Sequence, residues 1–482
     1  MTGSSDTPVG SASEIHTLIS RLREIVGEDN VLTGANLSAR ASHFRDASPL
    51  HAAALVRPAD TQETSQVLSL CNTASQVVVT HGGVTGLVDG DCCTPDDIVL
   101  STERMNTIEP VDVAGRTVST GAGAILQNVQ QAVHDAGLQL GLDLGSRGSC
   151  TIGGNISTNA GGLSVLRYGM MREQVLGLEV VMADGTILST MNRMMKNNAG
   201  YDLKQLFIGS EGTLGVITRA VLRLRAATPA VDTALLAFDS FEHVTDTLHH
   251  LGQHLNGTLD SFEVIWQPFF RLNTDPGIEG TSQAPLARDH PIYAIAESRA
   301  TRTATDSGVL PTALEEALEK GWVSDAVIAQ SERERRNIWH IREHIDIALR
   351  HDPVFVYDIS LPIADMQAYV SDIDTQLQTR WPGCNLYVYG HLADGNLHVL
   401  VAPAADESLD EATRLDWHRH SNTIVYGPLQ GLGGSISAEH GIGLSKKSYL
   451  SLSRTQAEIS LMRTLKKTLD PAGILNPGKI ID

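Results

Sequence analysis

Clustered glycines are the feature that most constrains how this chain can fold. Glycine contributes 43 of the 482 residues, or about 9% against a typical value near 7%. Residues 81–90 form one glycine-rich segment after a β-branched run, and the density is highest between residues 141 and 169. Because glycine lets the backbone approach a ligand closely, we expect these segments to be binding loops.

Strand-like and helix-like segments alternate around the first glycine-rich loop. Residues 52–56 form a short apolar run, and Asp60 offers a helix N-cap with Glu63 three residues later. Residues 76–80 then return as a β-branched strand. This order predicts a β-α-β unit that ends in a ligand-binding loop.

The pattern changes after residue 226. Two strands at 178–182 and 184–188 and a glycine-rich turn with a strand at 207–224 precede this point. A strand at 231–238 and a helix at 243–255 follow it. We therefore expect a domain boundary near residues 226–230, and an amphipathic helix at 456–469 near the end of the chain.

Charge and composition exclude several classes of partner. The net charge of −20 argues against nucleic acid or an anionic membrane surface, and no stretch of about 18 apolar residues predicts a membrane span. The five scattered cysteines lack metal-binding spacing and predict reduced thiols in a cytoplasmic protein. Residues 1–12 are rich in Ser, Gly and Thr and are expected to form a flexible tail.

Two glycine-rich loops carry donors suited to a pyrophosphate. The loop at 81–87 can present consecutive backbone N–H groups with Thr85 as an extra donor, and the loop at 145–155 adds backbone and hydroxyl donors. Either loop alone could be a structural turn. No GxGxxG motif follows a strand, which disfavours a nicotinamide site.

A strand pair near residue 390 carries two histidines. Asp394-Gly395 is a preferred two-residue hairpin turn, which would place His391 directly opposite His398. Opposed Cβ atoms lie about 4.5–5.5 Å apart, so both imidazoles could bind one ion, although a stacked pair of core histidines is the alternative. Glu439 could complete a two-histidine, one-carboxylate site or could be a cap or salt-bridge residue.

Several long motifs resemble one family of flavoproteins. Residues 143–162 resemble the flavin-binding core of the vanillyl-alcohol-oxidase-type flavoproteins, most closely the D-lactate and D-2-hydroxyglutarate dehydrogenase branch. Residues 197–204, 207–215 and 476–479 also fit, so the resemblance covers about residues 40–482. It implies an α+β fold with a two-subdomain FAD-binding domain and an α+β cap domain that contains an antiparallel sheet. The expected parts are the FAD-binding domain at 1–226, the cap, with substrate and metal sites, at 227–455, and a helix and tail returning to the FAD domain at 456–482.

The resemblance also implies which residues hold the cofactors. The expected FAD contacts are Gly82, Gly83, Thr85, Gly86, Leu87, Gly145, Ser146, Gly148, Ser149, Ile152, Gly153, Asn155, Ser157, Asn159, Gly215, Val216, Ile217 and Asn476. His391, His398 and Glu439 are assigned to a divalent metal, for which Zn²⁺ suits the ligands best and Mn²⁺ or Fe²⁺ are alternatives. Relatives with covalent FAD have a histidine where this chain has Val84, so we expect non-covalent FAD.

The implied activity is an FAD- and metal-dependent oxidation of a D-2-hydroxy acid to the 2-oxo acid by hydride transfer to the flavin. His440, beside Glu439, is the candidate general base, and Arg342 matches the family's substrate-carboxylate arginine. Val356 and Leu400 stand where the D-2-hydroxyglutarate branch has a lysine and an asparagine. Because this chain lacks the lysine and the asparagine, we expect a substrate with a short or apolar side chain, such as lactate. D-2-hydroxyglutarate is the alternative substrate.

Other classes of protein remain open from the sequence. They are a flavin oxidase, a dihydroxyacetone-phosphate-type transferase on the same scaffold, and a metal-binding structural protein whose flavin site is vestigial. The intact glycine loops argue against the last. As partners we expect a small 2-hydroxy acid and an electron acceptor (an electron-transfer flavoprotein, a quinone or a cytochrome), with a homodimer as an open alternative to a monomer.

Overall fold

The structure is a computed structural model that describes residues 12–43, 46–301, 308–404 and 409–482. Its α-helices are α1 (Ala12–Val26), α2 (Gly34–Ser38), α3 (Thr61–Thr73), α4 (Leu126–Asp135), α5 (Ile152–Ser157), α6 (Val165–Tyr168), α7 (Met171–Gln174), α8 (Phe241–His254), α9 (Gln267–Asn273), α10 (Val309–Glu319), α11 (Glu332–Glu343), α12 (Met366–Arg380), α13 (Glu411–Tyr426), α14 (Leu429–Leu432) and α15 (Gln456–Leu469). Short 3-10 helices are η1 (Glu28–Asn30), η2 (Leu203–Leu206), η3 (Ile345–Arg350), η4 (Ile363–Asp365), η5 (Leu392–Asp394) and η6 (Lys447–Leu452). The predicted flexible tail falls on residues 1–11, outside the described residues, except for Ala12, which begins α1.

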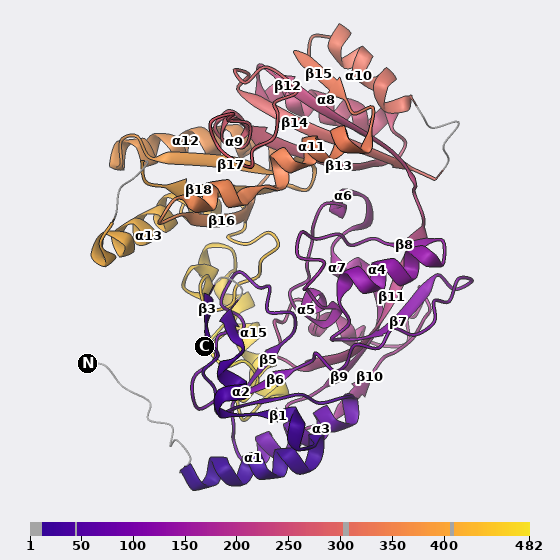
Figure 1. Cartoon of the computed structure of the whole chain (residues 1–482), viewed down its shortest axis with the longest axis vertical. Helices are drawn as coiled ribbons and strands as arrows, with labels where there is room; N and C mark the ends of the chain where they lie inside the picture. The colour runs from indigo at the N-terminus through magenta and orange to yellow at the C-terminus, as the bar shows by residue number, and fades with distance from the viewer. Residues whose placement is uncertain (1–11, 44–45, 302–307, 405–408) are drawn as a thin grey trace.

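A small sheet lies in the lower part of the molecule in Figure 1 and contains the predicted β-α-β unit. Its order is β1 (Val31–Leu32), β4 (Ala54–Val56), β6 (Ile98–Ser101) and β5 (Val78–His81), and the last three strands are parallel. Helix α3 connects β4 to β5 and begins as predicted, because the Asp60 carboxylate accepts the Glu63 N–H at 2.9 Å. The first glycine-rich loop follows β5 directly. A separate two-stranded sheet pairs β2 (Ala41–His43) with β3 (Asp46–Pro49).

A second, antiparallel sheet supports the other glycine-rich motif. Its order is β10 (Ile187–Ser189), β9 (Val175–Val181), β11 (Val216–Ala226) and β7 (Thr117–Gly121), with β8 (Leu138–Leu140) also paired to β11. Apolar side chains of α4 and α5 pack with this sheet in one buried cluster that includes Leu126, Ile152 and Leu222. Helix α5, which carries the family motif, is therefore fixed against the sheet.

The largest sheet has seven antiparallel strands and forms the upper part of Figure 1. Its order is β15 (Asp325–Ile328), β12 (Ala230–Phe238), β14 (Ile292–Ala300), β13 (Leu259–Trp266), β17 (Asn385–His391), β18 (Asn396–Ala402) and β16 (Phe355–Ser360). Helices α8, α10, α12 and α13 share one buried apolar cluster with it, while α9 and α11 belong to a second cluster. Because alternate residues of a strand face opposite sides of the sheet, the strands contribute side chains to both clusters. The predicted α+β cap with an antiparallel sheet is confirmed.

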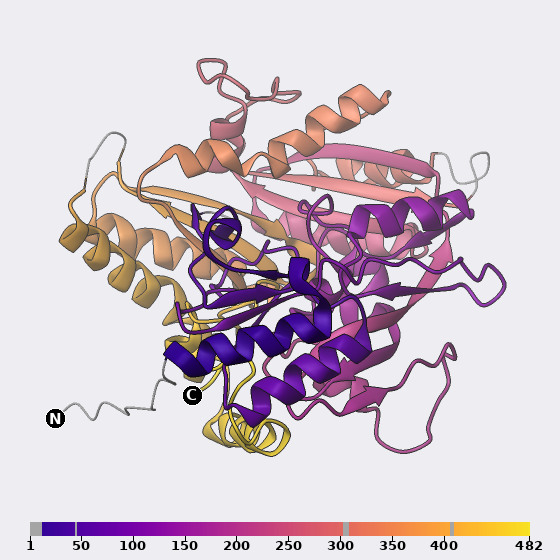
Figure 2. The same cartoon turned by 60° about the horizontal axis from the view of Figure 1, so that its bottom comes forward.

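The C-terminal segment returns to the small sheet. Helix α15 covers the predicted range, and Thr455 and Glu458 form a capping box at its start. Leu475 then bridges Val78 of β5 in a parallel arrangement. Figures 1 and 2 show this yellow segment beside indigo elements from the beginning of the chain.

Two further observations concern membrane-spanning helices and disulfides among the described residues. Within the residues that the structure describes, no helix combines the length and the apolar character needed to cross a bilayer. No disulfide joins the five cysteines, all of which belong to the described part of the chain.

Candidate active site

The structure brings the two predicted phosphate loops into contact. A methyl group added at Gly83 would lie 2.2 Å from the carbonyl oxygen of Ser149, and one added at Gly82 would lie 2.7 Å from Thr151 Oγ1. Both contacts are far closer than real Cβ atoms tolerate, so only glycine fits at these positions. Thr151 also caps α5 by accepting the Gly154 N–H at 3.4 Å.

The other predicted flavin contacts lie around this junction. Thr85, Gly86 and Leu87 continue the first loop, and Gly145, Ser146 and Gly148 precede Ser149 in the second. Ile152, Gly153, Asn155 and Ser157 are in α5, Asn159 follows it, and Gly215, Val216 and Ile217 lie at the start of β11. Asn476 binds backbone on both sides, because its Oδ1 accepts the Thr80 N–H and its Nδ2 donates to the Glu211 carbonyl.

The residues present fit a dinucleotide such as FAD. The two loops pack against each other at Gly82 and Gly83 and form a glycine-lined cradle in which Gly86 and Gly145 face open space. At the entrance to the first loop, the buried Thr80 Oγ1 has no hydrogen-bond partner among the described residues. A buried hydroxyl of this kind is normally satisfied, and a bound ligand could supply its partner.

The predicted two-residue turn at Asp394-Gly395 is wrong. Residues Leu392–Asp394 form the 3-10 helix η5, and Gly395 follows it with a φ of 84°. The observed register pairs Tyr389, rather than His391, with His398. Because side chains alternate with a period of two, this shift of two residues leaves both histidines on the same face.

The three predicted metal ligands converge. Ligand atoms of His391, His398 and Glu439 all lie within 4.8 Å of one another, and His391 Nε2 is 4.0 Å from Glu439 Oε1. Atoms bound at 2.0–2.2 Å to one ion can be at most about 4.3 Å apart. The separation of His391 and Glu439 is therefore compatible with one shared ion, and two imidazoles with one carboxylate are the donor set that zinc accepts.

A buried glutamate that the sequence analysis missed holds this cluster in place. Glu263 on β13 accepts the His391 Nδ1–H at 2.7 Å and the Arg342 Nε–H at 2.8 Å. Burial would raise the pKa of Glu263, but His391 and Arg342 together lower it. Arg342 Nη2 also lies 3.3 Å from His391 Nε2, and because guanidinium only donates, that nitrogen carries a lone pair that now accepts this hydrogen bond and that an ion would have to take over.

A second missed carboxylate, Asp358 on β16, organises the segment that carries Glu439. Its Oδ2 accepts the backbone N–H groups of Glu439 and His440, each at 2.9 Å. It also lies 3.8 Å from His440 Nδ1, and the His440 ring stacks on that of His398 with centroids 5.9 Å apart. Burial would raise the pKa of Asp358, but His440, Lys446, His398 and the backbone donors hold it well below its usual range.

The metal cluster meets the flavin motif directly. Gly162, the last residue of the family motif, donates its N–H to Glu439 Oε1 at 2.7 Å. A methyl group at Gly161 would overlap the same oxygen. Glu211, a third residue that the sequence analysis passed over, accepts the N–H groups of Ile442 and Gly443 at 2.7 and 2.8 Å. Candidate metal ligands and candidate flavin loop therefore form one continuous site.

A sequence signal existed for two of the missed carboxylates. Glu263 and Asp358 lie in mostly apolar strand segments, 259–266 and 355–360, although the first segment also contains Asp260. A charged residue in a fully buried strand is almost always paired. The sequence alone did not indicate which residues these two carboxylates pair with.

Comparison with known proteins places the chain in a family. Residues 228–480 match the family model of the FAD linked oxidases, C-terminal domain, and residues 52–191 match the FAD binding domain. The chain is a flavoprotein of the FAD-linked oxidase family, with a vanillyl-alcohol-oxidase-type fold.

Similar proteins place the chain in one branch of this family. It is 39% identical to the D-2-hydroxyglutarate dehydrogenase of Xanthomonas citri pv. viticola over 434 residues, or 89% of each chain. It is 36% identical over 440 residues to a Schizosaccharomyces pombe protein named "Putative D-lactate dehydrogenase C713.03, mitochondrial", over 88% of this chain and 81% of that one. The structure of p-cresol methylhydroxylase shares the fold, with a TM-score of 0.76, 14% identity and 98% of each chain covered. The chain therefore belongs to the D-2-hydroxyglutarate and D-lactate dehydrogenase branch of this family.

Proposed function

We propose that this chain oxidises a D-2-hydroxy acid to the corresponding 2-oxo acid. The observation that carries the proposal is the hydrogen bond between Gly162 of the flavin motif and Glu439 of the metal cluster. This contact supports a metal site for the substrate hydroxyl beside the site of the hydride acceptor. When bound, FAD would supply the redox chemistry, and a divalent ion at His391, His398 and Glu439 would supply Lewis acidity.

His440 is the residue that we propose takes the hydroxyl proton. Its side chain is about one-fifth exposed, which leaves it accessible to a small ligand, while Asp358 on its other side is fully buried. Asp358 would hold the ring in one orientation and stabilise the imidazolium that forms when the proton arrives. It is therefore a positioning residue for the base.

Arg342 is the proposed partner for the substrate carboxylate. The guanidinium is buried beside His391, and its position is fixed by Glu263 and by the face of the Tyr389 ring, 4.4 Å away. Its Nε is committed to Glu263, while Nη2 lies at the cluster, 3.3 Å from His391 Nε2. A cation held there can bind and orient an anionic ligand by charge-assisted hydrogen bonds.

The relatives favour D-2-hydroxyglutarate as the substrate over the lactate-like acid that the sequence predicted. The relative from Xanthomonas citri bears that name, and so do most of the similar curated proteins. A distal carboxylate would then need its own cation or amide partner in the site.

One observation supports a second candidate, an acid with a short or apolar side chain. Val356 and Leu400 are directly paired on β16 and β18, two residues from the pair of Asp358 and His398 on the same face of the sheet. Leu400 is almost fully buried. An apolar pair at this place offers no partner to a second carboxylate, whose desolvation would then oppose binding.

The experiment is anaerobic reduction of the bound flavin by D- and L-2-hydroxy acids, followed by absorbance. We expect D-acids to bleach the flavin, and chelator treatment to slow the reaction. Faster bleaching by D-2-hydroxyglutarate than by D-lactate would select the first candidate, and the reverse order would select the second. Failure of every 2-hydroxy acid to bleach the flavin would refute the proposal.

Two variants sharpen this test. His440→Gln should slow flavin reduction by about 10²–10⁴-fold without releasing metal, whereas His420→Gln, on α13, should leave the rate unchanged because that ring pairs with Asp416. Val356→Lys should raise the rate with D-2-hydroxyglutarate relative to D-lactate if the strand pair sets specificity.

A further inference from the structure

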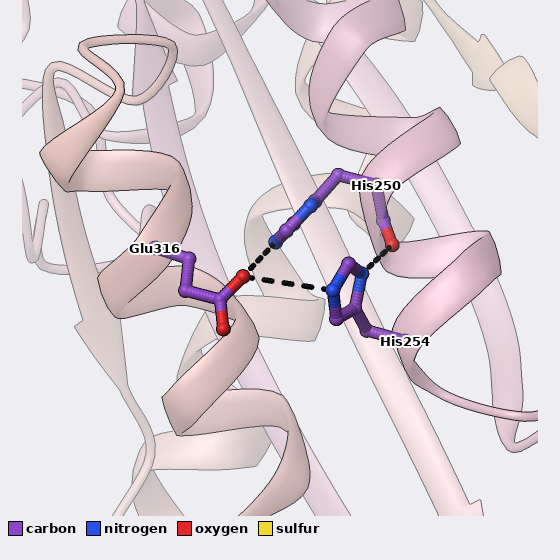
Figure 3. Close-up of side chains that lie close together, drawn as sticks. All are labelled: His250, His254 and Glu316. Atoms are coloured by element: carbon purple, nitrogen blue, oxygen red, sulfur yellow. Dashed lines mark hydrogen bonds and ion pairs between the residues drawn. The ribbon is translucent and has the colours of Figure 1, made fainter.

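A second group of potential metal ligands lies far from the site described above. His250 and His254 are one turn apart on α8, and Glu316 faces them from α10. Figure 3 shows both rings and the carboxylate pointing toward one another across the gap between the two helices. Ligand atoms of the three residues lie within 4.8 Å of one another.

The distances match a metal site better than a hydrogen-bonded cluster. Glu316 Oε2 lies 3.5 Å from His250 Nε2 and 3.5 Å from His254 Nε2. Both separations are longer than a good N–H···O hydrogen bond. Two atoms bound at about 2.1 Å to a tetrahedral ion would be about 3.4 Å apart, which is close to the separations observed.

Between His254 and Glu316, the surrounding hydrogen bonds leave lone pairs facing one another. His254 Nδ1 donates to the His250 carbonyl at 2.8 Å, because a carbonyl can only accept. The Nε2 of a neutral His254 therefore presents a lone pair to the Glu316 carboxylate, which is also an acceptor. Two acceptors in this arrangement require a cation between them, either a proton or a metal ion.

We propose that His250, His254 and Glu316 bind one divalent transition-metal ion of the zinc class and thereby join α8 to α10. Imidazole and carboxylate ligands suit Zn²⁺, Co²⁺ and Ni²⁺, and two histidines at i and i+4 on a helix can share one ion. A water molecule or the Ala313 carbonyl would complete the coordination. The role is structural, since neither helix carries a residue of the proposed active site.

Two features limit the affinity. His250 Nε2 lies 3.0 Å from the Ala313 carbonyl, so an ion must displace a hydrogen bond to reach that nitrogen. The side chains of His254 and Glu316 are 42% and 44% exposed, so water competes for the ion. We therefore expect this ion to leave more readily on chelation than one held by the buried His391 and His398.

The test is metal binding to the full-length, FAD-loaded protein. The protein is treated with chelator, desalted and titrated with Zn²⁺ or Co²⁺, and bound metal per chain is measured by elemental analysis. His254→Ala and Glu316→Gln change exposed side chains and should fold normally, whereas His250 is buried and is left intact. His249→Ala is the matched control, because His249 is exposed on the same helix and contacts Gln253 instead.

The two site variants should each bind one equivalent less than the wild type and show a smaller metal-induced rise in melting temperature, because only the cluster at His391 still binds metal in them. The His249→Ala control should keep both, and flavin reduction should be equal in all four proteins. If the site variants bind as much metal as the wild type, the cation between these acceptors is a proton and the proposal is overturned. This result is independent of the proposed function, because the cluster at His391 titrates in every variant.

Discussion

Glu263→Gln is the substitution that most directly tests how the active-site cluster is held. Glu263 is 1% exposed and lies between His391 and the guanidinium of Arg342, itself only 7% exposed. Glutamine has nearly the same shape but no charge, so the variant removes the charge while it preserves the packing. It leaves a buried arginine without its carboxylate.

The substitution should change both the unfolding free energy and the metal affinity. Breaking a buried ion pair by neutralising one partner costs about 3–5 kcal/mol of unfolding free energy, and we expect the lower end because the glutamine carbonyl still accepts one hydrogen bond. Loss of the carboxylate behind a metal-binding histidine lowers metal affinity by about 10–100-fold. Both effects should appear in the same variant, because the same carboxylate serves His391 and Arg342.

The assays are urea denaturation of the metal-free protein and competitive chelator titration of the metal-loaded protein. Glu103→Gln is the matched control, since Glu103 pairs with Arg40 and Arg57 but is 34% exposed. It should cost at most about 1 kcal/mol and leave metal affinity unchanged. A Glu263→Gln protein with wild-type metal affinity would show that Glu263 does not support the metal cluster. Stability equal to that of the Glu103→Gln control would refute the estimate for the buried pair.

Three further predictions concern the cofactors and acid stability. Gly83→Ala should release FAD, measured as lost flavin absorbance after gel filtration, because its methyl group would overlap the Ser149 carbonyl; retained flavin would contradict the cradle. Chelation should slow substrate-dependent flavin reduction while leaving reduction by dithionite unchanged, and equal slowing of both would point to general damage. Burial raises the pKa of Glu297, but Arg299 and Arg335 lower it overall. A depressed folded-state pKa contributes stability above the unfolded value of about 4.3 and loses it as the pH falls through the folded value. The unfolding free energy should thus decline below about pH 4.3, and Glu297→Gln should make this decline shallower.

The sequence was sufficient for features that depend on local chemistry. The N-cap at Asp60 and the bounds of α15 follow from neighbouring residues alone, and both are confirmed. The glycines at 82 and 83 predicted a close approach of the backbone to a ligand, and at these two positions the structure shows a close approach to a second loop. The fold class was implied by the resemblance of several motifs, in order, to one family.

Only the tertiary structure decided how distant strands are aligned and what the buried charges contact. The hairpin register was predicted two residues out, because the four residues between β17 and β18 adopt a 3-10 turn that dipeptide preference did not reveal. Glu263 meets His391 across 128 positions of sequence, and Asp358 meets His440 across 82. Sequence determined that histidines and carboxylates would be present. Strand pairing decided which of them share a face, since hydrogen bonding between strands, rather than proximity along the chain, brings their side chains together.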